Sequence, residues 1–113
     1  MTMKFNELPE FEKEFKKLRK KYKSLPNDLG IFKKVLKKIP LGNSKHFNTL
    51  HNTEDVCIVK ARFFCKYLKG SSLRIVYGYL KKEKRIELIE IYSKSKKKRE
   101  NKEKIKEYLN SLK

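Results

Sequence analysis

Hydrophobic residues in the first part of the chain recur at the three- and four-residue spacing of amphipathic helices. The first stripe consists of Phe11, Phe15, Leu18, Tyr22 and Leu25. With acidic residues early and lysines late, it predicts a helix over residues 8–23. The second stripe consists of Leu29, Phe32, Val35, Leu36 and Ile39. It predicts a helix that runs to about residue 38, and the short connection between the two favours an antiparallel helical hairpin.

From Val56 onward, hydrophobic and polar residues alternate with the two-residue period of β-strands. The alternating segments are VCIVKARFF at 56–64, LRIVYGYL at 73–80 and IELIEIY at 86–92. The polar stretch 81–85 is typical of a hairpin turn, so we expect a three-stranded antiparallel meander. The stretch 41–54 is expected to be a loop, and residues 1–7 are either a terminal strand or an extended lead-in to Pro9.

The chain finishes in a charged segment, SKSKKKRENKEKIKEYLNSLK, with a thin apolar stripe that predicts a last helix from about Asn101. The stripe consists of Ile105, Tyr108, Leu109 and Leu112. A chain of 113 residues fits one domain, residues 1–113. The predicted class is α+β, with an N-terminal helical hairpin packed on a three- or four-stranded antiparallel sheet and a C-terminal helix.

The formal net charge of +18, from 31 Lys and Arg against 13 Asp and Glu, is extreme for this length. Internal salt bridges cannot neutralise such an excess, so the partner is expected to be a polyanion. Nucleic acid, an anionic membrane surface and an acidic protein all meet that condition. Composition alone does not choose among them.

The distribution of apolar residues and cysteines bears on the compartment. No segment approaches the ~18 consecutive apolar residues of a membrane span, and the N-terminus lacks the apolar core of a signal peptide. A cytoplasmic protein without a membrane partner is therefore expected. Cys57 and Cys65 do not form a CxxC pair, and in a reducing cytosol they are expected to be free buried thiols.

Strand alternation places basic side chains together on one face of the predicted sheet. Lys60 and Arg62 share that face about 7 Å apart, and Arg74 on the neighbouring strand is able to join them. Helices are expected to cover the opposite face and to leave the cationic face open. The residues expected on the helix-covered face are Cys57, Val59, Ala61, Phe63, Ile75, Tyr77, Ile89 and Ile91. The residues expected to rim the cationic face are Lys94, Lys96, Lys97, Lys98 and Arg99.

Fixed cations of this kind suit the cleavage of RNA without a metal ion. The 2′-hydroxyl of the RNA attacks the adjacent phosphate, and cations stabilise the charge that builds on the phosphoryl oxygens. Proton transfer by a general base and a general acid, typically worth about 10² to 10⁴ in rate, is also needed. Lys60, Lys94 and Tyr92 are the candidates for that role.

The same pattern also has a purely structural interpretation. Glu90 is expected on the face of Leu88 and Tyr92, where it could pair with Arg62 or Arg74 as a half-buried bridge. In that case the cations serve the fold and bind no substrate.

Other side chains that could carry chemistry give weaker indications. Glu87 and Glu90 are expected on opposite faces of their strand, so they do not indicate a metal-binding set. His46 and His51 stand in the predicted loop without a third ligand and are expected at the surface. Motifs for a nucleophile or a phosphate-binding loop are absent from the sequence. No metal ion or other cofactor is therefore expected.

The strand segments resemble a known family. IVKARFFC, then KG, then LRIVYGYL and IELIEIYSKS resemble the RelE/ParE toxin superfamily, nearest its RelE-like and HigB-like ribonuclease branch, over residues 5–110. The resemblance implies ribosome-dependent cleavage of mRNA on the open face of the sheet, and neutralisation by a cognate antitoxin. By position, Lys60, Arg62 and Arg74 match the basic strand residues of the family. Lys94 matches a basic residue at the end of the last strand, with Lys97 as the fallback.

One departure from the family concerns proton transfer. Several members carry a Tyr or His in the C-terminal segment, whereas here no histidine follows His51, and Tyr92 lies earlier. A ParE-like inhibitor of DNA gyrase, which needs no phosphate-facing cluster, therefore stays open as an alternative, as does a non-catalytic basic module that binds RNA or the ribosome. Both the endoribonuclease and the non-catalytic module would need a basic surface for RNA. The residues expected to contact RNA or the ribosome are Lys66, Lys69, Lys96, Lys97, Lys98 and Arg99.

Overall fold

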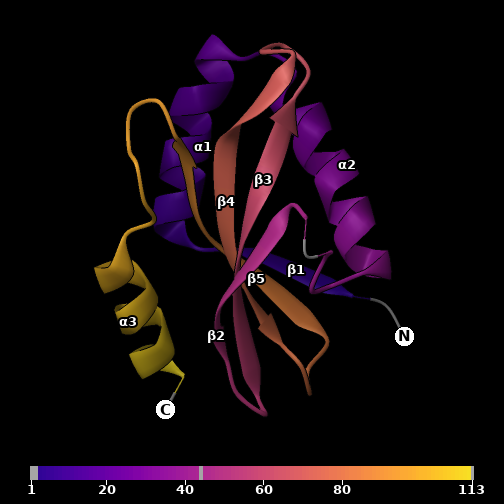
Figure 1. Ribbon diagram of the computed structural model, residues 1–113, viewed down its shortest axis with the longest axis vertical. Coiled ribbons are helices and arrows are strands. Elements are labelled where there is room, and N and C mark those ends of the chain that lie inside the picture. The colour runs from indigo at the N-terminus through magenta and orange to yellow at the C-terminus, as the bar shows by residue number, and fades with distance from the viewer. Residues whose placement is uncertain (1–2, 44, 113) are drawn as a thin grey trace.

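The computed structural model, shown in Figure 1, describes residues 3–43 and 45–112, and only the backbone of residues 71 and 72. Its elements are β1 (Lys4–Glu7), α1 (Pro9–Lys21), α2 (Leu25–Lys38), β2 (Phe47–Asn52), β3 (Val56–Cys65), β4 (Gly70–Leu80), β5 (Arg85–Ser93) and α3 (Lys102–Ser111). The strands of the described residues form a sheet in the order β1-β5-β4-β3-β2. All neighbouring strands are antiparallel except the β1–β5 pair. The predicted α+β class is confirmed.

The two N-terminal helices lie where their apolar stripes predict them. α1 begins at Pro9, whose fixed φ suits a first helical turn, and carries acidic residues early and basic residues late. The predicted hairpin packing is seen only in part: α1 lies mainly on β5 and α2 mainly on β3, with little contact between the helices. Each helix turns its main apolar stripe toward the sheet and not toward the other helix.

Two strands differ from the sequence-based expectation. The stretch 41–54 is not all loop, because Phe47–Asn52 forms the edge strand β2 against β3. An edge strand buries little, so FNTLHN lacks the alternation that marks the inner strands, and its register shifts between Thr49 and His51. At the other edge of the sheet, Lys4–Glu7 is a strand that pairs in parallel with β5. Of the two possibilities for the N-terminal segment, a strand or an extended lead-in to Pro9, the structure has the strand.

The sheet has an apolar layer on each face. The larger layer lies under α1 and α2, where Tyr77 and Tyr79 point inward as expected and the Tyr77 hydroxyl donates to the Pro40 carbonyl at 2.6 Å. The smaller layer lies under α3 and includes Ile58, Val76, Tyr92 and Tyr108. The expectation of a fully open second face is therefore wrong, because apolar residues on that face hold α3 and leave only part of it exposed.

A bulge in β5 changes which residues face α3. Val76 pairs with Glu90 and Tyr77 pairs with Leu88, so Ile89 is an extra residue on β5. Ile89 therefore lies in the layer under α3 and Leu88 in the layer under α1 and α2, contrary to the expected alternation. The expectation that Glu87 and Glu90 lie on opposite faces is wrong for the same reason: Glu87 bonds to α3 and Glu90 to the segment before it.

The contact between α3 and the sheet depends on Gly78, which lies under the Tyr108 ring. A Cβ atom at Gly78 would come within 2.8 Å of that ring, and the Tyr108 hydroxyl donates to Glu87 Oε1 at 2.7 Å. Gly78→Ala is therefore expected to lower the free energy of unfolding by about 1 to 3 kcal/mol through overpacking, measured by urea denaturation. Gly30→Ala in α2, where nothing lies within 4 Å, is the control and should stabilise by about 0.5 to 1 kcal/mol. Equal effects of the two substitutions would contradict this packing.

Candidate functional site

The exposed part of the second face holds a pocket of about 260 Å³ that we call the cation pocket. Its lining residues are Lys45, His46, Phe47, Asn48, Lys60, Ala61, Arg62, Arg74 and Lys94. β2 and β3 form one wall, β4 contributes Arg74, and Lys94 follows the end of β5. The structure thus brings together four of the five residues that the sequence analysis named as catalytic candidates: Lys60, Arg62, Arg74 and Lys94.

The two arginines of the cation pocket face each other across neighbouring strands. Arg62 and Arg74 are directly opposite in the β3–β4 register, which places like charges side by side. Burial, and then the charge of Arg62, lower the pKa of Arg74 from its usual value. The Arg74 guanidinium also donates to the Leu73 carbonyl at 3.0 Å. A repulsive pair held by the backbone in this way is poised to bind an anion that lies between the two side chains.

Lys60 reaches an acidic side chain that the sequence analysis did not single out. Its ammonium lies 2.9 Å from Glu100 Oε1, and both side chains are largely buried, with 25% and 10% of their surface exposed. Burial raises the pKa of Glu100, but the hydrogen bond from Lys60 and the charge of Lys60 outweigh it, so the net direction is down. This ion pair therefore ties the segment between β5 and α3 to β3.

Glu90 forms a half-buried bridge, with Lys97 as its cation. Only 2% of Glu90 is exposed, and its carboxylate accepts hydrogen bonds from the Lys97 ammonium and, at 2.9 Å, from the Asn101 backbone N–H. The Lys97 ammonium also lies 5.4 Å from the centroid of the Tyr92 ring. Lys97 therefore ties the segment before α3 to the sheet, and it is absent from the lining of the cation pocket.

Tyr92, the fifth catalytic candidate, is 7% exposed and lies in the apolar layer beneath the C-terminal segment. It pairs with Arg74 in the β4–β5 register. Burial, and then the carboxylates of Glu100 and Glu90, raise the pKa of Tyr92 to about 12. The phenol is therefore protonated at neutral pH, which suits a hydrogen-bond donor better than a general base.

The residues predicted to contact RNA do not all lie on one surface. Lys66 and Lys69 stand in the exposed turn between β3 and β4, and Lys98 and Arg99 are exposed before α3. Lys96 lies against α1 instead, where a contact with Lys21 and the charge of Lys21 lower its pKa. None of the residues in this basic set lines the cation pocket.

His46 is exposed in the turn before β2, as the sequence analysis expected of a surface residue in a loop. Its place in the lining of the cation pocket, together with Lys45 and Asn48, was not predicted. The position of His46 depends on the strand that follows it, because β2 begins at Phe47 and pairs with β3. An edge strand without alternation gives no pattern from which this position could be predicted.

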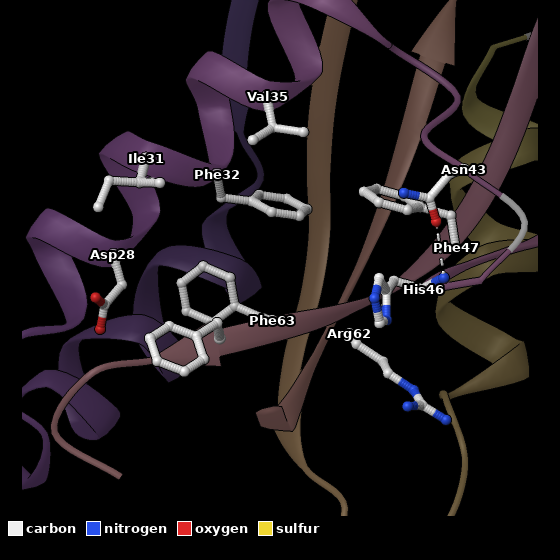
Figure 2. Close-up of a pocket in the computed structure, with 10 residues that line it drawn as sticks. Asp28, Ile31, Phe32, Val35, Asn43, His46, Phe47, Arg62 and Phe63 are labelled. Carbon is white, nitrogen blue, oxygen red and sulfur yellow. Dashed lines mark hydrogen bonds between the residues drawn. The ribbon is translucent and has the colours of Figure 1, made fainter. Parts of the chain in front are cut away.

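A second pocket of about 380 Å³ adjoins the cation pocket and shares His46, Phe47 and Arg62 with it. Its lining residues are Asp28, Ile31, Phe32, Val35, Asn43, His46, Phe47, Arg62, Phe63 and Phe64. Figure 2 shows Asp28, Ile31 and Val35 along α2 at one end, the Phe32 and Phe63 rings in the middle, and His46 beside Arg62 at the other end. We call it the apolar pocket.

The structure also bears on cofactors and thiols. Within residues 3–43 and 45–112, no group of three His, Cys, Asp or Glu side chains comes together as a metal site would require. Cys57 and Cys65 are buried free thiols, and burial raises the pKa of Cys57. None of the helices in the described part of the chain is long and apolar enough to cross a membrane.

Comparison with known proteins identifies the fold. No protein-family model matches the chain, and no curated protein matches it in sequence. A chain of the crystal structure of the archaeal RelE–RelB complex from Pyrococcus horikoshii OT3 matches it in structure, with a TM-score of 0.64 and 20% sequence identity. The match covers 82% of this chain and 96% of that chain. The protein described here therefore has a RelE-like fold.

Proposed function

We propose that this protein is the toxin of a type II toxin–antitoxin pair and that it cleaves mRNA at the ribosome as a metal-independent endoribonuclease. The observation that carries the proposal is the cation pocket, where Arg62 and Arg74 face each other beside Lys60 and Lys94 on a RelE-like sheet. The charge balance of +18 fits a polyanionic substrate.

We assign a role in this proposed reaction to each of these cations of the pocket. Arg62 and Arg74 reach the phosphoryl oxygens from two strands and stabilise the charge that develops there as the 2′-hydroxyl attacks. Lys60 and Lys94 stand on either side of them and orient the RNA backbone. Tyr92 lies beside Arg74 as its cross-strand neighbour and helps to position it.

Basic residues outside the pocket guide the RNA and the ribosome toward it. Lys66, Lys69, Lys98 and Arg99 are exposed and follow the ends of β3 and β5, so they extend the positive surface beyond the pocket. Contacts of this kind depend steeply on salt, because each phosphate contact releases condensed counterions. Lys96 and Lys97 contribute to the local field rather than to direct contacts, since Lys96 lies near α1 and Lys97 binds Glu90.

A cognate antitoxin is the second partner that we propose. Ile31 and Phe64, both more than half exposed, flank the apolar pocket together with Val35, although large apolar side chains are usually buried. Lysines of α2 surround this strip, so an amphipathic segment with acidic residues at its edges fits it. Because Arg62 and His46 line both pockets, a segment bound there would also reach the cation pocket.

The proposed function is tested by inducing the chain in a bacterium, mapping transcript 5′ ends and assaying gyrase-linked DNA breaks in parallel. Cuts phased to codons, arising within minutes of induction, are the expected result. DNA breaks with intact transcripts would establish the gyrase inhibitor instead. Growth arrest with neither kind of break would leave a basic module that binds RNA or the ribosome without cutting.

A further inference from the structure

His46 lies at the junction of the two pockets, directly before β2. The Arg62 backbone N–H donates to the His46 carbonyl at 2.9 Å, so the pairing of β2 with β3 extends one residue beyond Phe47. The Phe47 ring stacks on Phe32 on the helix-covered side, 6.2 Å between centroids and 4° between planes. Alternation then places His46 on the face of Lys60 and Arg62. Figure 2 shows its imidazole beside the Arg62 side chain.

The turn that carries His46 is held by specific contacts. The Asn43 side chain accepts hydrogen bonds from the backbone N–H groups of Lys45 at 3.1 Å and His46 at 3.0 Å. Gly42 has a positive φ of 68°, and a Cβ atom there would come within 2.1 Å of the Phe47 ring. These contacts fix the backbone at His46 relative to Arg62, as a group that exchanges protons with a bound substrate requires.

The groups facing His46 are mostly cations. They are Lys45 beside it, Lys60 and Arg62 from β3, Arg74 from β4 and Lys94 after β5, with Asp28 of α2 at the far end of the apolar pocket. Asp28 is occupied by the Ser24 hydroxyl and the Lys66 N–H, and Glu100 by Lys60. Among the described side chains that line the cation pocket, His46 is the only histidine, and histidine is the residue type most suited to proton exchange near neutral pH.

We propose that His46 is the general base of the RNA cleavage reaction, a role that rests on the proposed function. Its imidazole takes the proton of the 2′-hydroxyl as the 2′-oxygen bonds to phosphorus and the bond from phosphorus to the 5′-oxygen breaks. Water supplies a proton to the departing 5′-oxygen, and the imidazolium returns its proton to solvent. The products are a 2′,3′-cyclic phosphate and a free 5′-hydroxyl. The base therefore comes from the N-terminal end of β2 and not from the C-terminal segment.

The test compares His46→Asn with His51→Asn, a matched histidine that lies within β2 and lines a different pocket, beside α3. Single-turnover cleavage of mRNA on purified ribosomes is measured with the full chain from about pH 5 to pH 9. His46→Asn is expected to cut about 10²-fold or more slowly with unchanged ribosome binding, and His51→Asn within about twofold of wild type. The wild-type rate should fall at acid pH as the base becomes protonated, and His46→Asn should lack this fall. Imidazole added to His46→Gly should restore part of the rate.

The outcomes separate this inference from the proposed function. No cleavage by the wild-type chain would refute the endoribonuclease itself. Cleavage by wild type together with an unchanged rate or an unchanged acid limb in His46→Asn would overturn the role of His46 and leave the ribonuclease standing. A loss of rate in His46→Asn that free imidazole does not relieve in His46→Gly would point to a positioning role and would equally overturn the general base.

Discussion

Arg74→Ala is expected to slow mRNA cleavage on purified ribosomes by at least about 10²-fold, the cost of removing one donor to a developing oxyanion. Its free energy of unfolding should stay within about 1 kcal/mol of wild type. Arg74 is only partly buried and faces the like charge of Arg62, so its removal relieves a repulsion as it deletes a donor. The cleavage rate is therefore expected to fall while the free energy of unfolding hardly changes, which marks a residue that serves the site and not the fold.

The control for this prediction is Arg19→Ala in the last turn of α1, an exposed arginine remote from the cation pocket. It removes the same charge and should change the cleavage rate less than threefold. Arg74→Lys retains the charge but not the planar donor pair, and it should recover only part of the rate. Equal losses in Arg74→Ala and Arg19→Ala would show that net charge, and not the geometry of the pocket, governs activity. Full activity in Arg74→Ala would remove this residue from the site.

The cation pocket was predictable from the sequence to the extent that it depends on alternation. Lys60 and Arg62 lie two residues apart on a regular strand, and Arg74 falls opposite Arg62 once β3 and β4 pair through a short turn. Such positions follow from the pleat alone. Lys94 also followed, because it comes directly after the last regular strand.

The parts that escaped prediction depend on contacts between segments distant in sequence. The bulge at Ile89 reverses the faces of the residues before it, and nothing in IELIEIY marks the extra residue. β2 is an edge strand with little to bury, so FNTLHN carries no period, and nothing in the sequence placed His46, in the turn before it, beside Arg62. The ion pair between Lys60 and Glu100 joins residues forty positions apart and depends on the path of the segment before α3.

That path also places Lys94 and Lys97, the two lysines that the family resemblance left open, in different surroundings. Lys94 lines the cation pocket, whereas Lys97 binds the buried carboxylate of Glu90. A structural role for Lys97 predicts that its removal costs stability first and activity only as a consequence. A catalytic role predicts the reverse, a slower reaction in a fold of unchanged stability. The two roles can therefore be separated by measuring both quantities on the same variants.

Lys97→Met is expected to lower the free energy of unfolding by about 3 kcal/mol, because it leaves Glu90 buried with the Asn101 N–H as its remaining donor. Lys98→Met, at the exposed neighbouring position, should change it by less than about 0.5 kcal/mol. Adding Glu90→Gln to Lys97→Met removes the stranded charge and keeps an acceptor for Asn101, so the double variant should be more stable than Lys97→Met alone. Urea denaturation of wild type, Lys97→Met, Glu90→Gln and the double variant measures the coupling between the two side chains.

The cleavage rates of the same variants complete the argument. If Lys97 only anchors the segment before α3, the double variant should regain activity along with stability, because Lys94 and Glu100 return to their places around the pocket. A double variant that is stable but remains about 10²-fold slow would place the Lys97 ammonium in the reaction itself. The anchor interpretation would also fail if Lys97→Met unfolded at the same urea concentration as wild type, since a buried carboxylate that loses its cation cannot leave the stability of the fold unchanged.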